Sequence, residues 1–586
     1  MKLSVVIPTC NRRKALERTL PTLLAQDFPA RDCEIVVVVD GSTDGTLEFL
    51  ERQKPAFRLK IIPQSNRGQT AARNTGIHAA EGDVAIFFDD DILCPPGILQ
   101  QHSAAHAGSD SLWVHGPVFV APESPRTLLR YKTEAQYASY YGGLDPAAQI
   151  RFPRDLCFLS ACNTSIRREI LLAHGGFDER APGYEDIELG LRLWKAGVRF
   201  HYLPSAVAYE LYVKPSWQFL QKRMSRKFAG SELYLSRKYP EYRPQSGLNA
   251  MGRPRGWKQF LWDASVRAPV SPLPLLKPPL WIAERLCRFV PVRKAGVRLL
   301  DAAGGIEMLR SALRDAGSWK ALQREFGMKL PVLMYHHVGP VRPDTDSGLT
   351  VTPDRFKAQV DWLARRGHVG IRPSDWLAWR RNAKSLPERP VLLTFDDAYA
   401  DVAEYALPVL ERHGFGAAVF VMTGRLGETI SWPQRKGVFR LMTAEQIRDW
   451  GGRGIEFGAH SRTHPDLTTL GPSELAEEVA GSQHDLEAIL RPPVRSFAYP
   501  YGTHNPAVSD CARSVYDLAF STEEGLNNLG TDPHLLRRTG VLPGEFMIDF
   551  ACRLRWGYSP FERLRARIRL RTRLKNAARA AFARSH

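Results

Sequence analysis

The sequence predicts a mixed α/β protein with two domain-sized blocks, because three observations agree. Its 586 residues and 65.9 kDa exceed what one hydrophobic core usually spans. Apolar, β-branched runs alternate with helical patterns in both halves of the chain. Hydrophobic residues make up 44% and charged residues 24%, as in ordinary globular proteins. The eight cysteines form no CxxC pair, which argues against a disulfide scaffold and against a cysteine zinc cluster.

The first block opens with strand patterns typical of a buried parallel sheet. The runs LSVVIP (3–8) and EIVVVVD (34–40) are apolar and β-branched. Between them, residues 14–26 predict a helix. DVAIFFDDD (83–91) predicts a further strand, which ends in three carboxylates.

The second block predicts an α/β fold from the same alternation of strand and helix patterns. Its expected strands lie in KLPVLMYHH (329–337), PVLLTFDD (390–397), GAAVFVM (416–422), GIEFGAH (454–460) and VRSFAYP (494–500). Residues 246–330 are rich in Pro, Arg and Leu and predict a connector with short helices such as WIAERLCRF (281–289).

The net charge of +18 is concentrated outside the two blocks. Residues 1–245 carry +4 and residues 331–560 carry −3, whereas residues 246–330 carry +9 and residues 561–586 carry +8. Such basic segments meet anionic lipid headgroups or nucleic acid, or are simply solvated surfaces.

No stretch reaches the roughly 20 uninterrupted apolar residues that span a bilayer. The nearest candidate, residues 268–283, is broken by Lys277 and five prolines. The apolar run at the N-terminus is too short for a signal peptide. We therefore expect a cytoplasmic protein, and we consider peripheral contact with the inner face of an anionic membrane.

The acidic strand end of the first block needs an explanation, because adjacent carboxylates repel one another unless a cation offsets their charge. Asp89 and Asp91 flank Asp90, and alternate residues of a strand end can point the same way. They could therefore bind one divalent ion, which would also hold a diphosphate. Taken alone, the triplet is more typical of a solvated acidic loop.

The segments around the triplet change that interpretation. They are VVIPTCNR (5–12), VVVDGSTDGT (37–46), NRGQTAARNTGI (66–77), FFDDD (87–91), NTSIRRE (163–169), GGFDE (175–179) and GYEDIELGLRL (183–193). In this order they resemble family 2 glycosyltransferases over about residues 1–240. The resemblance implies a GT-A fold and inverting transfer from a nucleotide-sugar donor, with Mg²⁺ or Mn²⁺ at the leaving diphosphate.

The resemblance also implies roles for individual residues. The expected substrate-binding residues are Thr9, Arg12, Asp40, Arg73, Asp90 and Glu185. Asp89 and Asp91 match the DxD metal ligands, and Asp186 matches the general base that takes a proton from the acceptor hydroxyl. Glu210 departs from the pattern, because many members place a histidine there to complete the metal site. A carboxylate can still bind either ion.

The second block contains paired carboxylates and paired histidines. LLTFDDA (392–398) ends a strand in Asp396 and Asp397, and His460 and His464 lie four residues apart. With one aspartate, two such histidines can form a face that holds an ion and leaves positions open for water and a substrate oxygen. The other aspartate would then be free to act as a base. An HxxxH pair alone would more often be incidental.

Together with FAYPYG (497–502), these residues resemble the NodB-type polysaccharide deacetylases of carbohydrate esterase family 4, over about residues 330–545. The resemblance implies a distorted (β/α) barrel with Asp396 as general base. It implies that Asp397, His460 and His464 hold Zn²⁺ or a similar divalent ion. The backbone N–H of Tyr501 would help to hold the oxyanion.

Two departures from this family pattern concern the catalytic machinery. Ala498 stands where the family has the arginine that steadies the base. Residues 535–538 read Leu-Leu-Arg-Arg, so the late Leu-x-x-His that supplies the general acid has no clear counterpart. His336, which follows the strand PVLM, is the expected acid instead. His336 and His337 could also be ordinary strand-end residues.

We therefore expect a bifunctional enzyme of cell-surface glycan or amino-sugar glycoconjugate synthesis. Residues 1–245 would transfer a sugar, with UDP-N-acetylglucosamine as the first-choice donor, to a glycan or lipid-linked acceptor. Residues 330–555 would remove an N-acetyl group, with residues 246–329 as basic connector and 556–586 as basic helical tail. In the alternative, an active transferase carries a degenerate deacetylase that binds glycan or is structural. A nucleic-acid binder would explain neither acidic strand end, so no nucleic-acid partner is expected.

Overall fold

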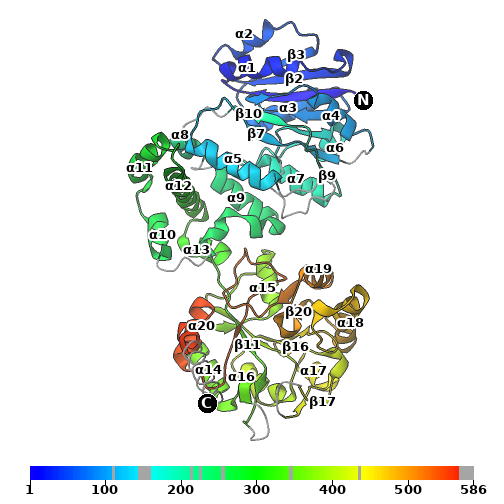
Figure 1. Ribbon diagram of the computed structural model, residues 1–586, viewed down its shortest axis with the longest axis vertical. Coiled ribbons are helices and arrows are strands. Elements are labelled where there is room, and N and C mark those ends of the chain that lie inside the picture. The colour runs from blue at the N-terminus through cyan, green and yellow to red at the C-terminus, as the bar shows by residue number, and fades with distance from the viewer. Residues whose placement is uncertain are drawn as a thin grey trace, which may run out of the picture. The chain divides into compact units, whose positions relative to one another are not determined.

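The computed structural model describes residues 1–108, 112–142, 160–211, 216–223, 227–252, 258–341, 347–432 and 437–565. The chain forms two compact units (Figure 1). Unit 1 comprises Met1–Leu248 and Pro254–Trp319, and unit 2 comprises Asn249–Arg253 and the chain from Lys320 onward. The predicted domain limits at 245, 329 and 555 stay predictions. Of the basic tail expected at 556–586, the part after residue 565 lies outside the described residues.

Unit 1 is built on a seven-stranded sheet in the order β3-β2-β1-β4-β8-β6-β9. The strands are β1 (Leu3–Thr9), β2 (Cys33–Asp40), β3 (Arg58–Gln64), β4 (Val84–Phe87), β6 (Leu112–His115), β8 (Thr164–Arg167) and β9 (Arg199–Tyr202). β1 to β4 run parallel, and β8 runs antiparallel to its neighbours β4 and β6. The strands predicted at 3–8 and 34–40 are confirmed, as is the helix predicted at 14–26, which is α1 (Arg13–Leu24). The strand predicted at 83–91 forms only over Val84–Phe87, so the acidic triplet lies beyond its end.

The carboxyl ends of β1, β2 and β4 lie at one edge of this sheet, because parallel strands share their direction. The chain leaves β4 at Phe87, so the acidic triplet follows directly at that edge. A small sheet lies beside the triplet and consists of β5 (Ile92–Leu93), β10 (Ala208–Glu210) and β7 (Val118–Val120). β10 pairs with β5, which places Glu210 opposite Ile92.

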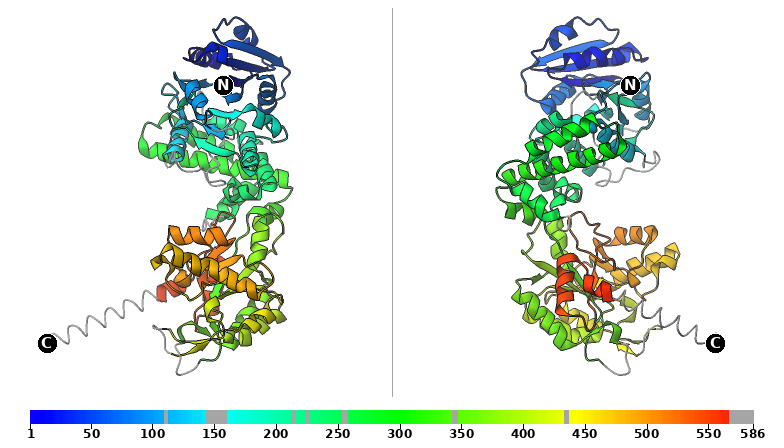
Figure 2. Two further views of the ribbon diagram at one scale, coloured as in Figure 1. Left: turned by 90° about the vertical axis from the view of Figure 1, so that its right-hand side faces the viewer. Right: turned by 60° about the vertical axis from the view of Figure 1, so that its left-hand side comes forward.

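The basic segment expected as a connector folds onto unit 1. It forms α10 (Lys258–Arg267), α11 (Leu273–Arg285) and α12 (Val290–Ala316). α12 is 27 residues long, so the expectation of short helices is wrong for this part. It packs beside α11 and against α5 (Leu128–Tyr141) and α9 (Lys227–Lys238) (Figures 1 and 2). Gly296 permits the close approach, because a side chain there would meet Leu128 and Ala283.

Unit 2 is built on an eight-stranded sheet in the order β21-β20-β19-β16-β15-β11-β22, with β14 paired to β15. The strands are β11 (Val332–Tyr335), β14 (Val369–Gly370), β15 (Pro390–Phe395), β16 (Ala417–Val421), β19 (Ile455–Ala459), β20 (Ser496–Ala498), β21 (Leu518–Phe520) and β22 (Thr539–Gly540). The pairs between these strands are parallel, and helices such as α14 (Pro353–Arg365) and α18 (Pro472–Ile489) alternate with them. The five strands predicted for this block are confirmed within the expected (β/α) fold.

None of the helices in the described ranges combines the length and the apolar character that crossing a membrane requires.

Candidate active sites

A cavity of about 790 Å³ opens at the carboxyl edge of the unit 1 sheet. It is lined by all the residues that the sequence predicted for this block, namely Thr9, Arg12, Asp40, Arg73, Asp89, Asp90, Asp91, Glu185 and Asp186. Arg73 comes from α3 (Gln69–Ala79), and Asp186 comes from α7 (Glu185–Lys195). Aromatic residues of α5, among them Tyr137 and Tyr141, form another part of the wall.

Two arginines hold the acidic triplet. Arg12 donates through Nε to Oδ1 of Asp90 at 3.1 Å and also pairs with Asp91. Arg73, with only 4% of its side chain exposed, donates to Asp89 at 2.8 Å and to Glu185 at 2.6 Å. Guanidinium groups therefore offset the carboxylate repulsion that the sequence alone attributed to a metal ion.

Burial raises the pKa of Asp90 to about 6, although the neighbouring Arg12 opposes the shift. Glu210 lines the same cavity as Asp89 and Asp91, but among the described residues these three carboxylates do not form a cluster close enough to hold one ion. Both aspartates are also paired with arginine, and an ion would have to compete with those pairs.

Asp40 organises the loop that leads into α3. Its Oδ1 accepts hydrogen bonds from the Gln64 side chain and the Arg67 backbone N–H, and its Oδ2 accepts one from the Gly68 N–H, each at 2.8 Å. Asp40 thus lines the cavity while it fixes the backbone that precedes Arg73. Its expected contact with the nucleotide stays a prediction.

Asp186 lies in the first turn of α7 and borders the cavity. Its carboxylate accepts hydrogen bonds from the backbone N–H groups of Ile187 (2.9 Å) and Ala161 (3.4 Å). Burial, followed by the charge of Glu185, raises its pKa to about 7 against the opposing charge of Arg73. A carboxylate with a pKa near 7 is well matched to general-base catalysis at neutral pH.

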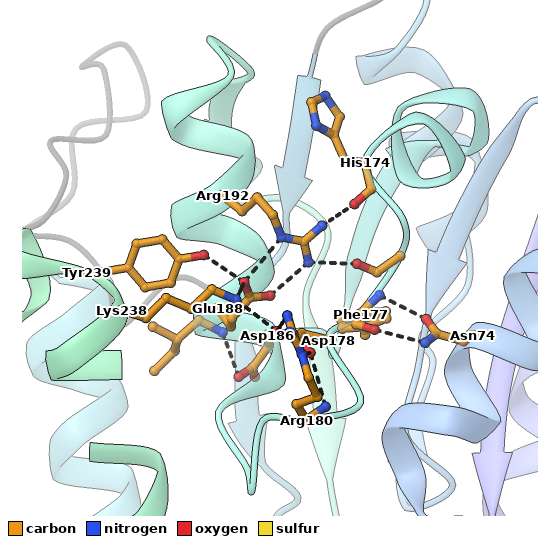
Figure 3. Close-up of polar contacts among 12 residues, drawn as sticks. Asn74, His174, Phe177, Asp178, Arg180, Asp186, Glu188, Arg192, Lys238 and Tyr239 are labelled. Atoms are coloured by element: carbon orange, nitrogen blue, oxygen red, sulfur yellow. Dashed lines mark hydrogen bonds and ion pairs between the residues drawn. The ribbon is translucent and has the colours of Figure 1, made fainter. Parts of the chain in front are cut away.

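A buried ion-pair network fixes α7, and sequence reasoning assigned it no role (Figure 3). Glu188 is fully buried and accepts from Arg192 (2.8 Å), Lys238 (2.8 Å) and Tyr239 (2.7 Å). Lys238 also pairs with Asp178 at 2.8 Å. Because Lys238 belongs to α9, the network ties α9 to the helix that carries Asp186.

Unit 2 contains a second, smaller cavity of about 170 Å³. The residues predicted for this block all line it, and they are His336, Asp396, Asp397, His460, His464 and Tyr501. Trp432, Tyr499, Gly502 and Thr522 complete the wall. The sequence motifs, which are far apart along the chain, therefore meet at one place.

Asp397, His460 and His464 form a cluster suited to a metal ion, and it is the one such group of three or more side chains in the described parts of the chain. Nε2 of each histidine lies 3.5 Å from Oδ1 of Asp397. That oxygen is buried and has no hydrogen-bond donor within the described structure. His460 donates its Nδ1 proton to the Ala498 carbonyl at 2.7 Å, which leaves Nε2 as the ligand atom. These donors fit Zn²⁺ or a similar ion.

The backbone at this cluster adopts conformations that non-glycine residues rarely take. Asp397 has a φ of 71°, His464 of 66° and Tyr501 of 58°. Left-handed conformations of this kind cost free energy and persist where the surrounding structure imposes them, often at functional sites.

Arg538 supplies a guanidinium in place of the motif arginine, which this chain lacks because residue 498 is alanine. It is fully buried and donates to Oδ1 of Asp396 at 2.6 Å and to the Ser521 carbonyl at 2.9 Å. Burial alone would raise the pKa of Asp396, but the charge of Arg538, with smaller contributions from His460 and His336, lowers it to about 2. The sequence therefore lacks the motif arginine, while the structure contains an arginine beside Asp396.

Sequence reasoning missed this pair because Arg538 lies beside a different strand from Asp396. In the sequence, residues 535–538 stand out only as a failed match to a histidine motif. Arg538 directly precedes β22, which pairs with β11, and β11 pairs with β15, whose end carries Asp396. The available signal for a buried partner was the pair of arginines, Arg537 and Arg538, that directly precedes β22.

The two strand-end histidines have different environments. His336 lines the cavity together with Asp396. His337 instead interacts through Nδ1 with Asp401 at 2.9 Å and stacks on Tyr399 with ring centroids 3.6 Å apart. Of this pair, His336 is thus the one placed to act on a substrate.

Comparison with protein families matches each unit separately. The model for Glycosyl transferase family 2 matches residues 4–175, and that for Glycosyl transferase family group 2 matches residues 104–291. The model for Polysaccharide deacetylase matches residues 383–516. The chain joins a family 2 glycosyltransferase domain to a polysaccharide deacetylase domain. Both domains belong to families of enzymes.

Individual relatives match one domain or the other. YxkH of Bacillus subtilis (strain 168), named a putative polysaccharide deacetylase, is 28% identical over 231 residues, which are 39% of this chain and 77% of YxkH. Validoxylamine A glucosyltransferase of Streptomyces hygroscopicus subsp. jinggangensis (strain 5008) is 33% identical over 219 residues, 33% of this chain and 52% of that enzyme. Poly(ribitol-phosphate) beta-N-acetylglucosaminyltransferase TarS of Staphylococcus aureus (strain Mu50 / ATCC 700699) is 39% identical over 93 residues, 16% of each chain. The chain thus spans about half of the glucosyltransferase and a small part of TarS.

Proposed function

We propose that the protein is bifunctional and acts in the synthesis of a cell-surface glycan or amino-sugar glycoconjugate. The glycosyltransferase domain would transfer a sugar from a nucleotide-sugar, and the deacetylase domain would remove an N-acetyl group from a glycan. The observation that carries the proposal is that each cavity is lined by a full predicted set of catalytic side chains. The limits 1–245 and 330–555 for the two catalytic domains are part of the proposal.

UDP-N-acetylglucosamine is the donor that we propose. The name of TarS specifies N-acetylglucosaminyl transfer, and a product that carries an N-acetyl group would be a substrate for the second domain. The name of the validoxylamine enzyme specifies a glucosyl group, so a panel of donors has to include UDP-glucose. The acceptor would be a glycan or a lipid-linked sugar.

In the transfer reaction, Asp186 would take the proton from the acceptor hydroxyl as its oxygen attacks the anomeric carbon. Thr9, Arg12 and Asp40 would line the nucleotide pocket. Mg²⁺ or Mn²⁺, when bound by Asp89 and Asp91, would neutralise charge on the departing diphosphate. Arg73 would hold Glu185, in the first turn of α7, beside the acidic triplet, because it donates to both Glu185 and Asp89.

In the deacetylation reaction, Asp396 would take a proton from the attacking water, with Arg538 keeping it ionised and oriented. Zn²⁺ or a similar ion, when bound by Asp397, His460 and His464, would polarise the acetamide carbonyl. His336 would give a proton to the departing amine, and the N–H of Tyr501 would stabilise the oxyanion. The products are acetate and a free amino sugar.

A degenerate deacetylase domain is the alternative that the sequence left open, and Ala498 was the reason for it. The contact of Arg538 with Asp396 removes that reason, because the base has a guanidinium partner. We therefore propose an active second domain. We also propose that the chain works at the inner face of an anionic membrane.

The test uses the purified full chain with a panel of nucleotide-sugars and with N-acetylated oligosaccharides. We expect sugar transfer to be lost in Asp186→Asn and acetate release to be lost in Asp396→Asn, each without effect on the other activity. Loss of both activities in either variant would contradict two independent sites. Wild-type transfer by Asp186→Asn would contradict the assignment of the base.

A further inference from the structure

Exposed apolar side chains gather on α11 and the turn that follows it. Between residues 270 and 290 the exposed large apolar residues are Val270 (75% exposed), Leu275 (79%), Trp281 (58%), Ile282 (51%), Leu286 (39%), Phe289 (49%) and Val290 (46%). Isolated apolar residues are common on protein surfaces, whereas a contiguous group marks a contact surface.

The helical spacing explains how α11 can expose one apolar face and bury another. Leu280, Ala283 and Cys287 are buried and pack in a cluster with Leu128 of α5 and Leu300 of α12. On the exposed side, Leu275, Pro279, Ile282 and Leu286 recur every three or four residues and therefore form a second stripe. The helix is thus apolar on two faces, of which the described residues cover only one.

Basic residues flank the exposed stripe. Lys277, Arg285 and Arg288 are exposed, and Arg285 lies over the ring of Trp281 at 4.7 Å while Arg288 lies over Phe289 at 5.0 Å. From Arg267 to Arg298 the chain carries seven Lys or Arg and a single acidic residue, Glu284. An exposed apolar stripe with an aromatic residue and a basic flank is the pattern of a helix that lies in a membrane interface.

The surface is also continuous with the helices that line the transferase cavity. α11 packs against α8 (Ser216–Arg223) and, through α12, against α5. Gln218 of α8 and Leu129, Tyr137 and Tyr140 of α5 belong to the cavity wall. A membrane under α11 would therefore lie next to the elements that bound the cavity of Asp186.

We propose that α11 and the turn to α12 dock unit 1 onto an anionic membrane surface, with Leu275, Ile282 and Leu286 in the acyl boundary and Lys277, Arg285 and Arg288 at the headgroups. This refines the membrane contact proposed above by giving it a surface. It does not depend on either catalytic assignment, because vesicle binding is measured without donor or acceptor.

The experiment is co-sedimentation of the full chain at low salt with vesicles of equimolar phosphatidylcholine and phosphatidylglycerol, and with vesicles of phosphatidylcholine alone. We expect binding to the anionic vesicles only. Lys277→Gln/Arg285→Gln/Arg288→Gln should weaken the partition coefficient about a hundredfold. Each cation near an anionic surface contributes a factor of about five, and the variant removes three of them. Leu275→Ser/Ile282→Ser should weaken the partition coefficient at least about a hundredfold, because burying each of these side chains contributes about 1.5 kcal/mol or more.

The matched control is Val438→Ser/Ile548→Ser, which removes apolar residues of similar exposure (62% and 55%) from unit 2 and should bind as the wild type does. Trp281→Phe should keep binding but reduce fluorescence quenching by brominated lipid, which distinguishes insertion from adsorption. All variants should keep the wild-type melting temperature, since the altered side chains are exposed.

Three results would overturn the proposal. The first is equal binding by Leu275→Ser/Ile282→Ser and the wild type, which would mean that the apolar stripe of α11 does not enter the membrane. The second is loss of binding on truncation after Pro560 while the α11 variants still bind, which would assign the contact to the tail. The third is a wild-type dimer that the α11 variants convert to a monomer without a change in vesicle binding, which would make a second copy the partner.

Discussion

Replacing Arg538 with methionine tests whether the deacetylase domain depends on a guanidinium that comes from outside the family motif. The variant keeps much of the apolar stem but removes the charge that faces Asp396 at 2.6 Å. The side chains are 0% and 4% exposed, so solvent screens the pair very little. Breaking a buried pair while leaving one charge behind costs about 3–5 kcal/mol, and we expect a loss of stability of that size.

The assay combines calorimetry of the intact chain with acetate release from an N-acetylated oligosaccharide. The transition of unit 2 is the one that should move upward when Zn²⁺ is added. Arg538→Met should lower that transition and reduce kcat, because Asp396 loses its orienting partner. Arg537→Met is the matched control, since that neighbouring side chain is 48% exposed and should change neither quantity.

A double-mutant cycle decides whether Arg538 acts through Asp396. Asp396→Asn removes the second charge, so the double variant should be destabilised by less than the sum of the two single variants. Additive losses of stability would refute the reasoning, because they would mean that the two groups do not interact. Wild-type stability and kcat in Arg538→Met would refute it directly.

Three further outcomes are expected. Sugar transfer should rise with pH through about 7 and level off above it, because Asp186 must be ionised to act as base and its pKa is raised to about 7; a flat profile between pH 5 and 8 would contradict this. His460→Ala and His464→Ala should each lose bound zinc, measured by elemental analysis, and acetate release, while sugar transfer is unchanged; full zinc content in both would contradict the cluster. Burial lowers the pKa of His115 to about 3, so the folded state loses stability as pH falls below about 6.5, by about 2 kcal/mol at pH 5. His115→Gln should remove that share of the pH dependence of melting, whereas the exposed His78→Gln should not.

Much of the fold and of both candidate sites could be predicted from local sequence. Buried parallel strands require runs such as EIVVVVD, and this run forms β2, buried along its whole length. Side chains that directly follow a strand are placed by that strand, so the sequence alone assigns Asp89 and Asp396 to the carboxyl edge of a sheet. The resemblance to a family then adds residues such as His460 to the same candidate site.

Only the tertiary structure decided which distant residues support those sites. Arg538 meets Asp396 across 142 positions, and Lys238 meets Glu188 across 50. Such contacts have no sequence period, because they depend on which strands and helices become neighbours after folding. The exposure of Ile282 and the burial of Ala283 on one helix were likewise undetermined, since an apolar residue is equally compatible with a core and with a membrane-facing surface until its neighbours are in place.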